Sequence, residues 1–423
     1  MNIEPNVFCN SPWFELHVYW NGDLGFCCQQ NNTPYTLETS NPYNIKNMSI
    51  KDWYNSDPMK QARLRMFEKE RWTNCHQCWK EEDTGATSRR DRSNQKSTIF
   101  KQKFEDSFNK SQNIELFTHS YYHNGETTQP PVDLHIDLGN YCNLACKMCW
   151  SGASSKIATQ EKKWGTLVDE NHLGNDWTKN EDVWNRFLNE LLETPIYNLH
   201  FMGGETLIQP KFEELIDYLI ENNKTDFGLS FVTNGTTFNQ ELILKLSKFS
   251  RLNIEVSIEA LTDINSYVRQ GTDTEVVLEN IKKFQKYSQV TIRPAISALT
   301  IRDFHTLLDF CLQENLVVKA LVVNGPPHLQ VSVLPKDIRE TYKEPYYKLI
   351  TENIHSDINH SVSSNSQHLV SMYAQQAISL LDQEQTSGFE ELIMHMKRWD
   401  PIYKYDAKKL YPELTEYLNE FKY

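Results

Sequence analysis

Residues 137–150 read Asp137-Leu-Gly-Asn-Tyr-Cys142-Asn-Leu-Ala-Cys146-Lys-Met-Cys149-Trp150. Three cysteines therefore lie on one short stretch, separated by three residues and then by two. Three thiolates on a short loop can hold three irons of a cubic 4Fe–4S cluster, since cysteine thiolates are the usual ligands of such clusters. The fourth iron would have no protein ligand and would be open to a small molecule.

The composition limits the class of protein. The chain has 423 residues, 39% of them hydrophobic, and a formal net charge of −13, which suits two or three globular domains. We find no run of roughly 18 apolar residues that could span a membrane, and the N-terminus lacks the basic and apolar parts of a secretory signal. We therefore expect a cytoplasmic protein without a membrane partner. The negative charge argues against a nucleic-acid binder, which needs a basic face.

The cysteines are concentrated at one end of the chain. Eight of the nine lie within the first 149 residues. Disulfides are uncommon in the reduced cytoplasm, so clustered cysteines there are more often metal ligands. The ninth, Cys311, lies in an apolar helical pattern and is expected to be a core thiol.

The chain divides into four predicted regions. Residues 1–95 are cysteine-rich, 96–131 are a polar linker, 132–330 alternate strands with helices, and 331–423 are helical. The predicted strands of the third region are Val132–Leu138, Tyr197–Met202, Gly228–Thr233, Asn253–Ile258, Val290–Ile296 and Ala320–Asn324. The predicted helices between them include Phe212–Asn222, Gln240–Phe249, Thr274–Tyr287 and Phe304–Glu314.

Strand–helix alternation of this length predicts an α/β fold with a parallel sheet covered by helices. Six units are too few for an eightfold barrel, so we expect a partial (β/α)6 barrel. In such folds the chemistry collects at the C-terminal ends of the strands, and the three-cysteine stretch directly follows the first strand.

The other strand ends carry residues that suit an amino acid linked to a nucleoside. Gly203-Gly204-Glu205 follows the second strand, and its glycines let a ligand approach the backbone while the carboxylate can bind an ammonium. Asn234 ends the third strand, and Ser257 ends the fourth, where polar groups could bind a ribose. Downstream, Arg269 offers a guanidinium suited to a carboxylate.

On these motifs the sequence resembles the radical S-adenosylmethionine (SAM) superfamily over roughly residues 132–325. The resemblance implies that Cys142, Cys146 and Cys149 hold a 4Fe–4S cluster whose open iron binds SAM. It implies that the reduced cluster cleaves SAM to a 5′-deoxyadenosyl radical, which abstracts hydrogen from a substrate. The SAM contacts carried over are Met148, Gly203, Gly204, Glu205, Asn234, Ser257 and Arg269, with no catalytic residue assigned beyond the cluster.

Two positions depart from the superfamily's pattern. Met148 stands where an aromatic residue often lies near the adenine, and its thioether would pack on the base less specifically. Thr206 stands where proline is common after the glycine motif, a change that leaves the amine ligand in place.

The N-terminal cysteines form a second pattern. Residues 11–25 alternate apolar and polar residues around an Asn-Gly turn, which predicts a β-hairpin that brings Cys9 and Cys27 together. Cys75 and Cys78 could complete a four-thiolate site. The pattern resembles the twitch domain, a short relative of the SPASM domain with one auxiliary 4Fe–4S cluster, placed here before the barrel. The stretch Cys75–Arg90, with Trp79, Glu82, Gly85 and Ser88, carries the same resemblance.

Each of these residues also has an alternative explanation without a role in catalysis. The four N-terminal cysteines could bind zinc instead, and the other three could be a zinc site or buried thiols. Cys28, next to Cys27, is a spare ligand, a redox thiol or, as we favour, a packing residue. Arg269 could pair with a carboxylate of the protein, and Ser257 could only cap a loop.

The sequence thus predicts a radical SAM enzyme of oxidoreductase type that oxidises or cross-links a residue of a peptide or protein. It would use a low-potential electron donor of the flavodoxin or ferredoxin type. One alternative is the same chemistry on a small metabolite, such as dehydrogenation of a sugar or an aminocyclitol. Another is a zinc-stabilised scaffold without catalysis.

Overall fold

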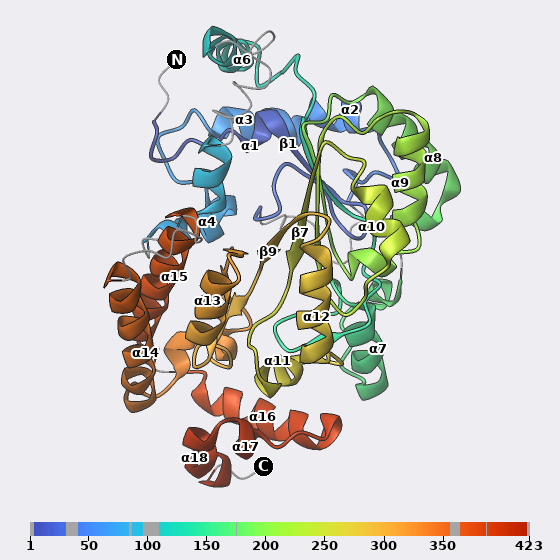
Figure 1. Ribbon diagram of the computed structural model, residues 1–423. Coiled ribbons are helices and arrows are strands. Elements are labelled where there is room, and N and C mark those ends of the chain that lie inside the picture. The colour runs from blue at the N-terminus through green and yellow to red at the C-terminus, as the bar shows by residue number, and fades with distance from the viewer. Residues whose placement is uncertain are drawn as a thin grey trace. The chain divides into compact units, whose positions relative to one another are not determined.

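The computed structural model describes residues 4–30, 41–83, 87–95, 110–174, 176–355, 364–385 and 387–420. The chain forms two compact units. The first contains residues 1–142, 151–231 and 240–252, and the second contains residues 143–150, 232–239 and 253–423. Figure 1 gives the labels of the helices and strands.

The first unit is built on a sheet with the strand order β2-β1-β3-β5-β6. Its strands are β1 (Glu15–Val18), β2 (Leu24–Gly25), β3 (Asp133–Asp137), β5 (Asn198–Met202) and β6 (Gly228–Thr233). The ladders that join β1 to β3, β3 to β5 and β5 to β6 are parallel, and the hairpin partner β2 is antiparallel to β1. The predicted hairpin is confirmed for residues 15–25, whereas Ser11–Phe14, predicted as part of it, form a short helix.

The second unit continues the alternation of strands and helices. Its strands are β7 (Arg251–Val256), β9 (Gln289–Ile292), β10 (Ala295–Ile296), β11 (Val317–Val318) and β12 (Leu321–Val322), with the short pair β4 (Ala145–Cys146) and β8 (Arg269–Gln270). β9 pairs in parallel with β7 and β11, and β10 pairs in parallel with β12. The predicted α/β class with parallel strands is confirmed. The fifth predicted strand is interrupted between β9 and β10. The sixth, Ala320–Asn324, contains β12, and β11 lies before its predicted start.

Amphipathic helices cover the strands of each unit. Those of the first unit are α1 (Ser11–Phe14), α2 (Ile50–Tyr54), α3 (Asp57–Arg65), α4 (His76–Asp83), α6 (Lys110–Tyr122), α7 (Ser155–Trp164), α8 (Glu181–Glu193), α9 (Phe212–Glu221) and α10 (Gln240–Leu246). Helices α8, α9 and α10 stand beside one another along one side of that unit's strands (Figure 1). α9 buries Phe212, Leu215, Ile216 and Leu219, the three- and four-residue spacing that predicted it.

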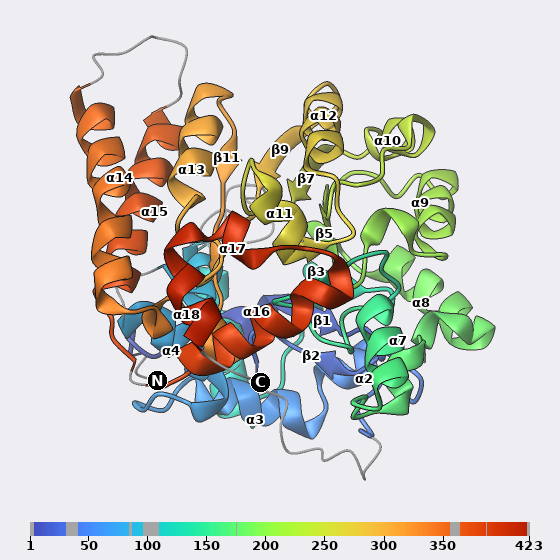
Figure 2. The ribbon, with the colours of Figure 1, turned by 90° about the horizontal axis from the view of Figure 1, so that it is seen from below.

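The helices of the second unit are α11 (Asp263–Val268), α12 (Thr274–Phe284), α13 (Phe304–Gln313), α14 (Lys336–His355), α15 (Ser364–Asp382), α16 (Phe389–Tyr403), α17 (Ala407–Leu410) and α18 (Thr415–Glu420). Figure 2 shows α13, α14 and α15 side by side. The expected helical character of the C-terminal region is confirmed for its described residues. Among the described helices, none combines the length and the hydrophobicity needed to cross a membrane.

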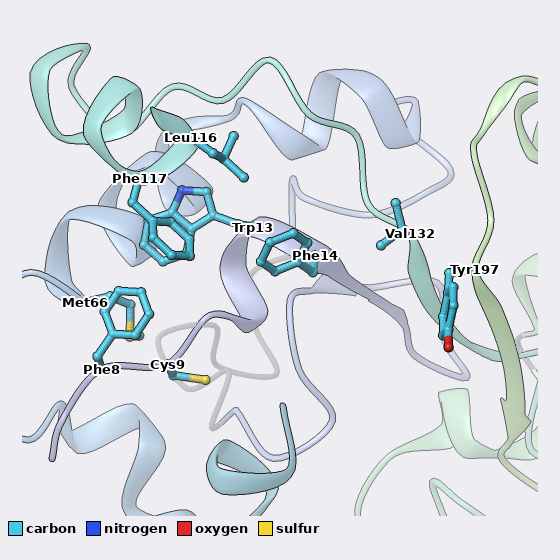
Figure 3. Close-up of a cluster of buried hydrophobic side chains, with 9 residues drawn as sticks. All are labelled: Phe8, Cys9, Trp13, Phe14, Met66, Leu116, Phe117, Val132 and Tyr197. Atoms are coloured by element: carbon cyan, nitrogen blue, oxygen red, sulfur yellow. The ribbon is translucent and has the colours of Figure 1, made fainter. Parts of the chain in front are cut away.

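One helix lies inside the stretch predicted as a linker. α6 buries Leu116 and Phe117 against Phe8 and Trp13, and its Ser120 accepts a hydrogen bond of 2.8 Å from the Trp13 indole. Figure 3 shows the side chains of Phe8, Trp13, Leu116 and Phe117 in one cluster that also includes Cys9. Part of the predicted linker is therefore core of the first unit. The four predicted domain boundaries remain a prediction.

We predict that Phe117→Ala lowers the free energy of unfolding by about 3–5 kcal/mol, because it leaves a cavity among buried aromatic rings. Tyr122→Ala is the control in the same helix. Tyr122 is 68% exposed, so its loss should change stability by no more than about 0.5 kcal/mol. Denaturant unfolding followed by circular dichroism measures both. Equal effects would mean that α6 is not part of this core.

Candidate functional site

Four N-terminal cysteines line one cavity of the first unit. Cys9 precedes α1, Cys27 follows the hairpin, Cys75 ends a short 3-10 helix (Thr73–Cys75) and Cys78 lies in α4. The residues that line the cavity are Cys9, Ser11, Phe26, Cys27, Gln29, Gln30, Cys75, Cys78, Arg89 and Arg90. The structure thus brings together the four residues proposed as auxiliary ligands. Of the neighbouring predicted motif, Gly85 lies outside the described residues.

The four thiols form a donor set that suits an iron–sulfur cluster. They line one hollow of the first unit, part of which is open to solvent. Four thiolates are the usual ligands of a 4Fe–4S cluster, and sites of four cysteines also bind structural zinc. Burial raises the pKa of Cys9 to about 11 and that of Cys78 to about 12. The donor set therefore fits a 4Fe–4S cluster, bound with release of the thiol protons.

Two arginines place positive charge at this cavity. Arg89 donates to Glu15 at 2.6 Å, and Arg90 donates to Glu82 at 2.8 Å and to the Phe8 carbonyl at 3.0 Å. Both guanidinium groups line the cavity, where their charge favours a negatively charged thiolate-bound group.

Cys28 does not belong to the described lining of the cavity. Its thiol contacts the Cys27 thiol and the ring of His135 on β3, and its hydrogen bond with Cys27 is the main reason that its pKa lies well below the ordinary thiol value. The role of Cys28 as a spare ligand, a redox thiol or a packing residue stays a prediction.

The glycine motif packs against the start of the three-cysteine stretch, within the first unit. Gly203 and Gly204 have φ of +83° and +57°. A side chain on Gly204 would overlap the Tyr141 carbonyl oxygen, and the Glu205 amide donates to that same oxygen at 2.8 Å. The conformation and the close approach both require glycine. The motif is thus held against the residue before Cys142.

Glu205 itself is 1% exposed. Its carboxylate accepts a hydrogen bond from the Leu207 amide at 3.2 Å and so caps the 3-10 helix Thr206–Ile208. The Cys142 amide donates to Ser155 at 3.1 Å.

The second half of the three-cysteine stretch belongs to the second unit. There β4 pairs antiparallel with β8, which fixes Cys146 opposite Arg269. Lys147 lies next to four aromatic rings, with its ammonium 3.9 Å from the Tyr267 centroid and 4.8 Å from that of Trp399 on α16. These cation–π contacts attach α16 to the cysteine stretch.

Arg269 makes a buried ion pair. Its guanidinium donates from Nη2 to Glu259 Oε1 at 2.8 Å, and from Nη1 to Cys146 Sγ at 3.6 Å. Although burial opposes the charge, the Glu259 carboxylate raises the pKa of Arg269. Arg269 is thus engaged by a carboxylate of the protein and by a proposed cluster ligand, and its contact with SAM remains a prediction.

The remaining predicted SAM contacts lie in the second unit. Asn234 donates to Asn143, one residue after Cys142, at 2.8 Å. The Ser257 amide donates to the Thr233 carbonyl at 2.9 Å. Met148 is half-buried. Their roles toward SAM stay predictions.

The sequence interpretation missed a polar row on the inner strands of the first unit. Asp133, His135 and Asp137 alternate with Leu134 and Ile136 along β3, and all five are buried. Strands of parallel sheets are usually apolar on both faces. Polar residues at every second position of β3 could therefore have indicated a functional row from the sequence alone.

Family models match both cysteine regions. The model described as "Radical SAM superfamily" matches residues 136–311, and the one described as "Iron-sulfur cluster-binding domain" matches residues 9–79. Residues 136–311 are thus a radical SAM domain. This domain is of the kind that holds a 4Fe–4S cluster and SAM, and the domain before it is of the kind that holds auxiliary iron–sulfur clusters.

Curated relatives of this radical SAM protein match it in part. Mycofactocin maturase MftC of Mycobacterium ulcerans is 26% identical over 140 residues, 33% of this chain and 32% of its own. PqqA peptide cyclase of Granulibacter bethesdensis is 23% identical over 145 residues, 34% of this chain and 33% of its own. The tungsten-containing aldehyde ferredoxin oxidoreductase cofactor-modifying protein of Pyrococcus furiosus is 25% identical over 252 residues, 52% of this chain and 64% of its own. The matches span about a third to two thirds of these relatives.

We predict that Gly204→Ala displaces the glycine motif of this radical SAM domain. The added carbon would overlap Tyr141 and force a left-handed conformation on alanine, at a cost of about 1–3 kcal/mol. Gly325→Ala is the control, because nothing lies within 4 Å of its added carbon. Thermal unfolding and SAM affinity, measured by equilibrium dialysis, should change only in Gly204→Ala. Unchanged values there would contradict the packing described above.

We also predict that Arg269→Gln destabilises the iron-free protein by about 3–5 kcal/mol, because it leaves Glu259 buried without its partner. Adding Glu259→Gln should restore most of the loss, which denaturant unfolding measures. Lys348→Gln, at an exposed side chain, serves as the control. If the double variant were no more stable than Arg269→Gln, the ion pair would not account for the loss.

Proposed function

We propose that this protein is a radical SAM enzyme that oxidises or cross-links a residue of a peptide or protein. The observation that carries the proposal is the presence, in one chain, of the three-cysteine stretch and of a separate cavity lined by four cysteines. When bound, a reduced cluster and SAM supply a 5′-deoxyadenosyl radical that abstracts hydrogen, and a second cluster supplies an acceptor for an electron.

The residues of the chain have distinct proposed roles. Cys142, Cys146 and Cys149 hold the SAM-binding cluster, and Cys9, Cys27, Cys75 and Cys78 hold the auxiliary one. Arg269 donates to a sulfur of the first set, and hydrogen bonds to cluster sulfurs raise the reduction potential. The backbone of Gly203 and Gly204 and the amide of Asn234 are proposed to position SAM.

A peptide substrate is supported by the relatives. PqqA peptide cyclase is named for a peptide, and two further relatives are named as maturation proteins. These matches cover 33–41% of this chain, so the support is for the class of substrate only.

A cofactor or other small molecule is the second candidate substrate. The cofactor-modifying protein of Pyrococcus furiosus matches 52% of this chain, more than the maturases do. We further propose a flavodoxin or ferredoxin as electron donor and the reduced cytoplasm as the location.

Cysteine variants test the separate roles proposed for the two sets of cluster ligands. We predict that anaerobically reconstituted Cys146→Ala forms no 5′-deoxyadenosine under dithionite, because one ligand of the SAM-binding cluster is lost. Cys78→Ala should retain part of this activity but form no product. Liquid chromatography quantifies deoxyadenosine, and elemental analysis should show that each variant loses iron. Full cleavage by Cys146→Ala would refute the assignment, and Cys311→Ala is the control for loss of an unrelated thiol.

The substrate class is tested with short peptides encoded beside the gene. Incubation with SAM and dithionite should remove hydrogen from such a peptide, which mass spectrometry detects. Modification of a small metabolite, with every such peptide unchanged, would favour the second candidate.

A further inference from the structure

Three histidines form a row across adjacent strands of the first unit. In the parallel register, His17 of β1 lies opposite His135 of β3, and His135 lies opposite His200 of β5. The rings of His17 and His135 stack with centroids 4.3 Å apart, and those of His135 and His200 meet edge to face at 4.6 Å. The proposed function uses none of them.

Asp137 lies between two of these histidines. Its Oδ2 is 3.2 Å from His17 Nε2, and its Oδ1 is 3.8 Å from His135 Nε2. One nitrogen from each ring and one carboxylate oxygen all lie within 4.8 Å of one another. Around a tetrahedral metal ion with bonds of 2.0–2.1 Å, the ligand atoms are about 3.4 Å apart. Side-chain movements of about 1 Å would therefore bring these three atoms to the distances that metal coordination needs.

The three side chains are buried and incompletely paired. His17 is 2% exposed, His135 is 7% and Asp137 is 6%. Within the described part of the chain, His17 Nδ1, His135 Nε2 and Asp137 Oδ1 are buried and have no hydrogen-bond partner. Buried polar atoms normally have hydrogen-bond partners, and a buried polar atom without a partner costs free energy. The hydrogen bond between His17 and Asp137 alone therefore does not explain the cluster.

Neighbouring groups contact two of these three residues, Asp137 and His135. The Trp177 indole donates to the Asp137 carbonyl at 2.9 Å. A side chain on Gly203 would come within 2.7 Å of the Asp137 Cβ, so glycine leaves room for the carboxylate. The Cys28 thiol contacts His135. Groups that contact a metal-binding imidazole without binding the metal help to orient its ring.

We propose that His17, His135 and Asp137 bind a divalent transition-metal ion, of which zinc is the probe. Two imidazoles and one carboxylate are a ligand set that such ions use, with remaining positions open to water or to another ligand. None of these three residues is among the proposed cluster ligands, and the metal site does not depend on the proposed function.

The test uses the full chain with its iron–sulfur sites loaded anaerobically and then incubated with zinc. We expect one zinc per chain, and X-ray absorption at the zinc edge should show nitrogen or oxygen ligands at about 2.0–2.1 Å rather than sulfur at about 2.3 Å. His135→Gln and the isosteric Asp137→Asn should each weaken zinc binding at least ~100-fold. Their iron content should stay unchanged, which shows that the variants fold.

His172→Gln is the matched control. His172 is also buried, and its Nε2 lies 3.6 Å from Asp169, but it is outside the three-residue set. Zinc affinity should be unchanged in this variant. The proposal is overturned if the wild-type chain takes up no zinc, if the zinc has sulfur ligands, or if Asp137→Asn binds zinc as tightly as the wild type.

Discussion

The parallel pairing of β1 with β3 is the constraint on which the rest of the first unit depends. β1 is the first strand of the hairpin that leads to Cys27, and β3 directly precedes the three-cysteine stretch. Their ladder pairs Glu15 with Asp133 and His17 with His135. Because a shift of one residue would turn every side chain to the opposite face, this register decides which polar groups meet.

Aromatic packing gives the four-cysteine cavity its support. Cys9 belongs to the same buried cluster as Phe8 and Trp13, and Cys75 packs against it. Phe117 also packs in this cluster, against Trp13, although the two residues are far apart in the sequence. A small domain has little core of its own, so the surrounding first unit supplies part of what keeps these thiols at one place in the fold.

In the second unit, buried charged groups hold the cysteine stretch in place. The Glu259 carboxylate is fully buried and is compensated by Arg269, which also reaches the Cys146 sulfur. The ammonium of Lys147 lies among the rings of Tyr267 and Trp399. Such paired, desolvated groups fix a loop more precisely than exposed ones. The residues that flank Cys146 are thereby held by partners that follow it by more than a hundred positions.

The sequence by itself indicated the cofactors and the order of the elements, because ligand spacing and hydrophobic periodicity are local properties. The spacing of Cys142, Cys146 and Cys149 and the glycine motif indicated the family, and the alternation of strands and helices indicated the fold class. Only the tertiary structure decided which distant residues meet. The pairing of β1 with β3, the packing of α6 on Trp13 and the meeting of His17, His135 and Asp137 depend on contacts more than a hundred residues apart, for which no local pattern exists.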